Sequence, residues 1–205
     1  MKTEEFKFFK QEQFSLYAPE RIQDVQSGDL PAPVAKFFSR ASAHLIRSSA
    51  LPIDRFDRLM LLDDGSGSIA YFAQHDKYYD HIDTTDRVVY EVDLDADGKI
   101  IMGFGEFFVP LDGENHLPSV MRSRTESEYQ EKGLGTRRLL AMNAVALREF
   151  GKPLNSDSLL SYAALRTWKR IVRLGLAEEY PYQPLNLNEP TPRFRFLTQT
   201  DVLKT

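Results

Sequence analysis

The sequence contains no cysteine in its 205 residues. This absence excludes disulfide bonds, thiolate zinc sites and cysteine nucleophiles. The chain also lacks any apolar run close to the roughly 18 residues that a membrane-spanning helix needs. Its first residues, MKTEEFKFFKQEQF, are too charged for a secretory signal peptide. We therefore expect a cytoplasmic protein with no membrane partner.

An excess of positive charge is lacking as well. The chain has 30 acidic and 26 basic residues, which gives a formal net charge of −4. Domains that bind nucleic acid are usually basic, so a nucleic-acid partner is not expected. Hydrophobic residues make up 42% of the sequence and charged residues 27%. These fractions are ordinary for a globular chain and exclude wholesale disorder.

Apolar spacing in the first third of the chain predicts one helix and two short strands. The helix face consists of residues at i, i+4, i+7 and i+11, namely Val34, Phe38, Ala41 and Leu45. The runs 59–62 and 69–73 flank a Gly/Ser turn and predict strands. The polar stretch 75–87 predicts a loop or a short helix.

Residues 88–109 predict a β-hairpin, because two apolar runs flank the tight-turn pair Asp97-Gly98. The string D-x-D-x-D-G from Asp93 also resembles the start of an EF-hand loop. That loop needs a glutamate at its twelfth position, which here is Phe104, so the hairpin is favoured. A second candidate metal cluster consists of His75, Asp76, Asp80 and His81. A polar surface segment is favoured there, and no metal is expected.

The clearest motif is Gln130-x-x-Gly133-x-Gly135, between a predicted strand at 119–125 and a predicted helix that ends near Phe150. Glycines let the backbone approach a ligand closely, and the first N–H groups of a helix have no partner inside the helix. Phosphate is a natural ligand for such a turn. Lys132 and Arg137 could add positive charge at its rim. The alternative is a plain glycine turn at the start of a helix.

A further helix is predicted over 159–174, after a short strand around Leu154 and before a last strand in PTPRFRFLT. This helix carries a basic stripe at i, i+3, i+4 and i+7, namely Arg166, Lys169, Arg170 and Arg173. The stripe is either a solvated face or a contact surface for a phosphate or an acidic partner.

The segment SRTESEYQEKGLGTRRLL, with the hairpin before it and the helix SYAALRTWKRIVRLGLAEE after it, resembles the GNAT family of acyl-CoA N-acyltransferases. The resemblance covers about residues 88–198. It implies an α/β (α+β) fold with a mixed, mostly antiparallel sheet flanked by helices. On this basis we expect a GNAT-like acyltransferase domain over 56–205 and a partly helical N-terminal extension over 1–55.

The resemblance also implies a coenzyme A site. Gln130 and the backbone of the turn would hold the pyrophosphate, and the strand before the turn would hydrogen-bond the pantetheine arm after separating from its neighbour. The implied binding residues are Ser123, Thr125, Gln130, Glu131, Lys132, Gly133, Leu134, Gly135 and Thr136.

Two family features do not match. Many members have a tyrosine acid on the last helix, where this chain has Trp168, whose indole is no practical acid. Some members have a glutamate base on the strand before the turn. The matching position here is near Ser119, where there is no carboxylate. Our candidates are therefore Tyr162 as the acid, although it lies at another place in the pattern, and Glu106 as the base. Glu106 alternates with apolar residues on its strand, and the alternative is a pair with an arginine.

We expect an acetyl-CoA-dependent N-acetyltransferase that acts on the amine of a small molecule or protein by direct transfer. The alternative is a catalytically inactive module of the same fold that acts in binding. A protein partner could dock on the N-terminal extension.

Overall fold

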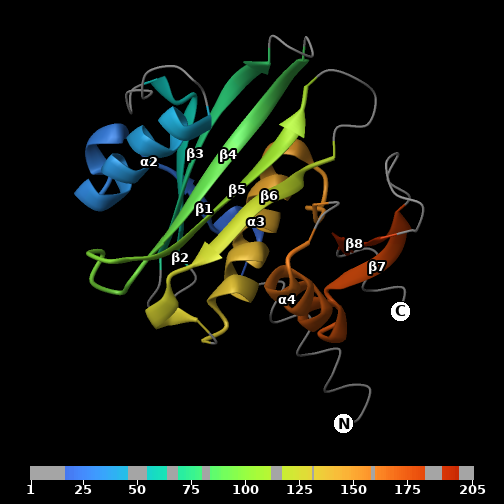
Figure 1. Ribbon diagram of the computed structural model, residues 1–205. Coiled ribbons are helices and arrows are strands. Elements are labelled where there is room, and N and C mark those ends of the chain that lie inside the picture. Colours follow the sequence, from blue (N-terminus) through green and yellow to red (C-terminus); the bar gives the residue numbers. More distant parts are fainter. Residues whose placement is uncertain are drawn as a thin grey trace.

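The computed structural model describes residues 17–45, 55–63, 69–79, 84–111, 117–130, 132–157, 160–182 and 191–198. It is a mixed α/β fold around a six-stranded antiparallel sheet (Figure 1). The sheet order β1-β2-β3-β4-β5-β6 is also the chain order. Its strands are β1 (Ile22–Asp24), β2 (Arg58–Asp63), β3 (Ile69–Tyr79), β4 (Thr84–Leu94), β5 (Ile101–Pro110) and β6 (Ser119–Thr125).

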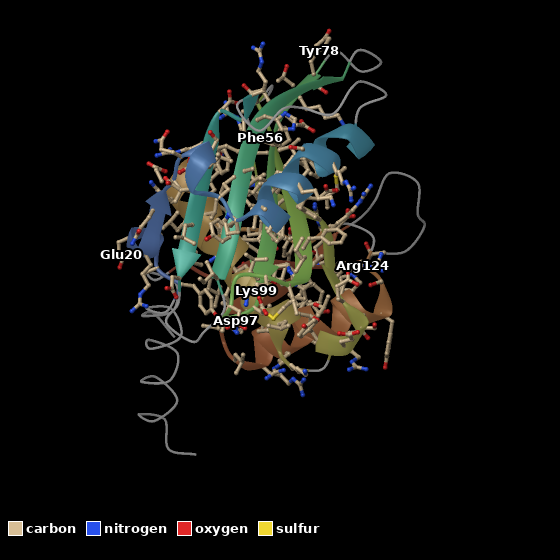
Figure 2. The ribbon with its side chains drawn as sticks, turned by 90° about the vertical axis from the view of Figure 1, so that its left-hand side faces the viewer. Glu20, Phe56, Tyr78, Asp97, Lys99 and Arg124 are labelled. Carbon is tan, nitrogen blue, oxygen red and sulfur yellow. The ribbon has the colours of Figure 1, made fainter. Side chains whose placement is uncertain are left out.

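Helices lie on both faces of the sheet. Helix α2 (Ala32–Leu45) lies across one face, as Figure 2 shows, and α3 (Leu134–Phe150) packs on the other. Helix α4 (Tyr162–Arg173) lies beside α3, and a hairpin of β7 (Ala177–Tyr182) and β8 (Thr191–Phe196) follows it. The short 3₁₀ segments are η1 (Pro19–Arg21), η2 (Ser27–Asp29) and η4 (Ser127–Tyr129). No helix in the described ranges is long and apolar enough to cross a membrane.

Two hydrophobic cores result, one on each face of the sheet. Alternate residues of β4 point to opposite faces, so Val88, Tyr90 and Val92 pack toward α2 while Val89 packs toward α3. The buried Phe38 of α2 belongs to the first core. Because β4 is covered on both sides, its second half is buried without interruption.

The stretch 75–87 is not the loop or short helix expected from its polarity. Strand β3 continues to Tyr79 and β4 begins at Thr84, so the described residues of this stretch, 75–79 and 84–87, belong to two paired strands. Polar pairs across the strands explain the extension. Asp76 lies opposite Arg87 and forms an ion pair with it, and the buried His75 ring stacks on Tyr90 at 5.6 Å.

The expected N-terminal extension packs on the sheet. β1 pairs with β2, and Val34 and Phe38 of α2 are fully buried. The expected boundary at residue 55 therefore separates segments that pack on one another. The side chains of Ala41 and Leu45, also expected on this helix face, lie outside the described ones.

The C-terminal part joins the sheet through a single residue. Asn155 forms a parallel bridge to Ser119 of β6 and an antiparallel bridge to Arg195 of β8. The short strand expected around Leu154 is thus a single residue, Asn155, that forms two isolated bridges. Strand β7 has no counterpart among the predicted elements, because Glu178, Glu179 and Pro181 are poor strand formers.

Candidate functional site

A cleft opens where β6 separates from the segment around Asn155. The two touch at one end, where the Val120 N–H donates to the Asn155 carbonyl at 2.9 Å and the Asn155 N–H donates to the Pro118 carbonyl at 2.8 Å. No further bridge joins them within the described ranges. The space beyond, about 1810 Å³, is bounded by β6, the start of α3 and α4. The resemblance implied that the strand before the turn separates from its neighbour, and β6 is that strand.

One wall of the cleft is the outer edge of β6. On this side, residues 121–124 form no backbone hydrogen bond with another strand among the described residues. Ser123 and Thr125 line the cleft, and their hydroxyl groups lie near Arg138, whose Nη1 donates to Thr125 Oγ1 at 3.1 Å. The strand therefore offers free backbone groups to a ligand, while Arg138 fixes the side chains of Ser123 and Thr125 by hydrogen bonds.

The glycine turn closes one end of the cleft. Gly133 has a φ of 82°, a left-handed conformation that favours glycine, and serves as the N-cap of α3. Among the described residues, no side chain caps this end. The Thr136 N–H donates to the Gly133 carbonyl at 3.1 Å, which leaves the N–H groups of Leu134 and Gly135 for an anion. The turn residues on the cleft surface are Gly133, Leu134, Gly135 and Thr136.

The residues before the turn differ in their positions. Gln130 lines the cleft, and its Nε2 donates to the Thr125 carbonyl at 3.3 Å, which ties the turn to β6. Lys132 is exposed, with Nζ 5.2 Å from the centre of the Tyr129 ring, and is not among the lining residues. Glu131 lies outside the described residues.

A buried arginine supports the cleft from inside the protein, and the sequence reasoning missed it. Arg138 of α3 has no solvent exposure, and its Nε lies 2.9 Å from Asp93 Oδ2 and 3.1 Å from Glu91 Oε2. Gly103 and Gly105 of β5 lie directly beside it, which leaves room for the guanidinium. The available signal was an arginine on the apolar face of a helix, together with two glycines spaced by two on a strand.

Two carboxylates share this one guanidinium. Burial, and then the charge of Asp93, raise the pKa of Glu91 well above its ordinary value of 4.5, against the opposing effect of Arg138. Neither carboxylate oxygen of Glu91 accepts a well-aligned hydrogen bond within the described residues. Of the two carboxylates, Asp93 accepts hydrogen bonds from the Arg138 guanidinium, and Glu91 is the one whose pKa burial raises.

The pH dependence of stability tests this assignment. A raised pKa means that the folded state retains a proton that the unfolded chain releases above pH 4.5. The Glu91 contribution to stability is thus full below that pH and is lost as the pH rises through the folded-state pKa. Glu91→Gln stays neutral, so we expect its unfolding free energy relative to wild type to increase between pH 5 and pH 8, measured by urea denaturation.

The control for this prediction is Asp93→Asn, which removes the charged partner of Arg138. Loss of one member of a buried ion pair costs about 3–5 kcal/mol, so this variant should be strongly destabilised at both pH values. If Glu91→Gln instead lost more stability at pH 8 than at pH 5, Glu91 would be the charged partner.

Helix α4 forms the wall opposite β6. Ser161 caps its N-terminus, with Oγ accepting from the Ala164 N–H at 3.2 Å. The full basic stripe lies on the cleft side, namely Arg166, Lys169, Arg170 and Arg173. Tyr162 also lines the cleft, is 76% exposed, and lies under the Arg166 guanidinium at 5.9 Å.

Glu106, the candidate base, is buried but is not among the residues that line the cleft. It lies on the same face of β5 as Phe104, whose ring contacts Phe37 of α2 at 5.3 Å. Its Oε1 is 3.2 Å from Nε of Arg122, which does line the cleft. Burial raises the pKa of Glu106, although Arg122 and Lys77 oppose the shift. The arginine pair weighed at the sequence level is therefore present.

Trp168, which the sequence resemblance matched to a tyrosine acid, belongs to the core. Its side chain is 1% exposed and stacks on Phe194 at 5.8 Å, with Phe196 at 5.2 Å. Trp168 is also among the residues that line the cleft. The structure thus uses this position to attach α4 to the hairpin β7–β8.

The candidate metal residues are dispersed. Asp93 binds Arg138, and Asp95 accepts the N–H groups of Lys99 and Ile100 at 2.8 and 2.9 Å, which shapes a hairpin turn. Asp76 faces Arg87 on a strand, while Asp80 and His81 lie outside the described residues. Within the described ranges, no three His, Cys, Asp or Glu side chains are grouped to hold a metal.

Comparison with solved structures gives a match to a crystal structure from Klebsiella pneumoniae subsp. pneumoniae MGH 78578, described as a "putative acyl-CoA N-acyltransferase". The TM-score is 0.36 and the sequence identity 15%, over 85% of this chain and 93% of that chain. No family model and no curated protein matches the sequence. With so low a TM-score, the function proposed below rests on the cleft and the glycine motif.

Proposed function

We propose that the chain transfers an acyl group, with acetyl as the first candidate, from acyl-coenzyme A to an amine. The observation that carries this proposal is the cleft itself, in which an unpaired strand edge leads to an uncapped helix N-terminus. Free helix N–H groups suit a diphosphate, and a strand edge suits the amide groups of a pantetheine arm. The strand edge and the helix N-terminus are close in the chain, because β6 ends at Thr125 and α3 begins at Leu134.

Direct transfer needs few groups from the protein. The amine nitrogen forms a bond with the acyl carbon, the carbon–sulfur bond breaks, and the thiolate takes up a proton while the new amide nitrogen loses one. Tyr162 has a hydroxyl on the cleft side of α4, where it is our candidate for the proton donor. Glu106 is our candidate for the proton acceptor. It would receive the proton directly, beside its ion-pair partner Arg122, or through a water molecule.

Glu106→Gln tests the base. The change keeps the size and hydrogen bonding of the side chain and removes its basicity. In an active preparation we expect the rate at pH 7 to fall at least about tenfold, with acetyl-CoA affinity unchanged. Part of the rate should return at high pH, where the amine is already neutral. An unchanged rate at pH 7 would reject Glu106 and leave water as the proton acceptor.

A second candidate function is binding without catalysis. Two observations favour it: the buried indole of Trp168 where an acid is expected, and the position of Glu106 outside the cleft lining. In that case the cleft would bind an acyl-CoA without transferring its acyl group.

One experiment separates the two functions. Acetyl-CoA binding is measured by calorimetry, and the same preparation is then assayed with a panel of small-molecule and peptide amines. Micromolar binding together with release of free thiol on addition of an amine supports transfer. Binding without thiol release on any amine supports the binding module, and no binding rejects both.

A further inference from the structure

We infer that the basic stripe of α4, defined as Arg166, Lys169, Arg170 and Arg173, is the second half of the phosphate site. We further infer that it makes the cleft select a donor that carries a phosphate on its ribose in addition to the diphosphate. This inference rests on the proposed function and assigns residues on α4 that face the glycine turn.

The first step of the argument is position. A Cβ built on Gly133 would lie 3.9 Å from Nη1 of Arg170, and one built on Gly135 would lie 3.7 Å from Oγ1 of Thr167. Arg170 therefore faces the turn across the space that an anion bound to the helix N–H groups would fill. A guanidinium and backbone N–H groups together form charge-assisted hydrogen bonds to a phosphate.

The second step is the direction of α4. Thr167 faces Gly135 and Arg170 faces Gly133, so the helix runs past the turn toward Arg173. Three residues advance a helix by about 4.5 Å, which places Arg173 beyond the turn on the same side. A second phosphate attached near the diphosphate, as on the ribose of coenzyme A, fits this further position.

The third step is charge balance. None of the four stripe residues forms an ion pair with a carboxylate of the described residues, whereas Arg58, Arg87, Arg148 and Arg195 all do. Like charges at i, i+3 and i+4 destabilise a helix. The helix dipole compensates cations near the C-terminus of α4, but not Arg166, which lies in its first half. A polyanionic ligand would balance all four.

The test is calorimetry at low salt with coenzyme A and with 3′-dephospho-coenzyme A. The variants are Arg170→Gln and Arg173→Gln. The matched control is Arg40→Gln, which changes an exposed arginine of α2 on the other face of the sheet. Losing a charge-assisted hydrogen bond reduces affinity by about tenfold or more.

We expect wild type to bind coenzyme A about tenfold more tightly than the dephospho form. Arg170→Gln should weaken both ligands, Arg173→Gln should weaken coenzyme A alone, and Arg40→Gln should change neither. Added salt should reduce the preference. If wild type binds both ligands equally and Arg170→Gln is unaffected, the inference is wrong while the proposed function stands. If wild type binds neither ligand, the proposed function fails, and an added DNA duplex that binds through the stripe would identify the alternative.

Discussion

Gly103→Ala is expected to destabilise the fold by about 3–5 kcal/mol, the cost of disrupting a buried ion pair. A Cβ at this position would lie 2.0 Å from Nη2 of Arg138 and 2.5 Å from the backbone carbonyl oxygen of Arg124. Arg138 cannot move aside freely, because it is held by Asp93 and packed without solvent exposure. The carbonyl belongs to the neighbouring strand, so relief would also require β6 to shift.

Urea denaturation of Gly103→Ala measures this cost, and Gly28→Ala is its control. A Cβ on Gly28 meets nothing within 4 Å, and its φ lies outside the left-handed region. We expect the control to retain wild-type stability to within about 0.5 kcal/mol, as surface changes usually do. Equal stability of the two variants would show that Arg138 is not held where the structure places it.

Gly133→Val is expected to reduce acetyl-CoA affinity by at least about a hundredfold, as expected when a whole diphosphate contact is lost. A Cβ on Gly133 would lie 3.9 Å from Nη1 of Arg170 and within 4 Å of no other atom of the described residues, at a position that lines the cleft. It would therefore exclude the phosphate without disturbing the core. Calorimetric titration with acetyl-CoA gives the affinity directly.

The control for this prediction is Gly151→Val at the opposite end of the same helix. Gly151 is also left-handed, with a φ of 65°, and has open space around it. Both variants should lose about 1–3 kcal/mol of stability from the strained backbone, but only Gly133→Val should lose affinity. If Gly133→Val folded and bound acetyl-CoA normally, the turn would not be the ligand site.

Much of the fold could be predicted because local patterns dominate it. The hairpin around Asp97-Gly98, the strand at 119–125 and the helix that ends before Gly151 are confirmed to within a few residues. Glycine marks the turn of the hairpin at Gly98 and the end of the helix at Gly151. The position of the glycine turn at the start of α3 was predicted from the Gly133-x-Gly135 motif.

The sequence could not reveal what depends on contacts between distant segments. Residues 75–87 look like a loop because the partners of their polar side chains are not adjacent in the sequence, as with Asp76 and Arg87 across the hairpin. An arginine on an apolar helix face was a signal for Arg138, but it could not identify the partners, because Asp93 lies 45 residues earlier in the chain. Likewise, the burial of Trp168 depends on Phe194 and Phe196, which come from a later strand.

The unpaired edge of β6 has a consequence for self-association. An open strand edge is a template on which another copy of a chain can add a strand, and charged side chains on such an edge oppose this. Arg122 and Arg124, with side chains 57% and 69% exposed, stand on this edge. Two copies brought together here would place arginine against arginine. Arg122 and Arg124, which also line the cleft, therefore keep the strand edge available for a small ligand by opposing its pairing with a second copy.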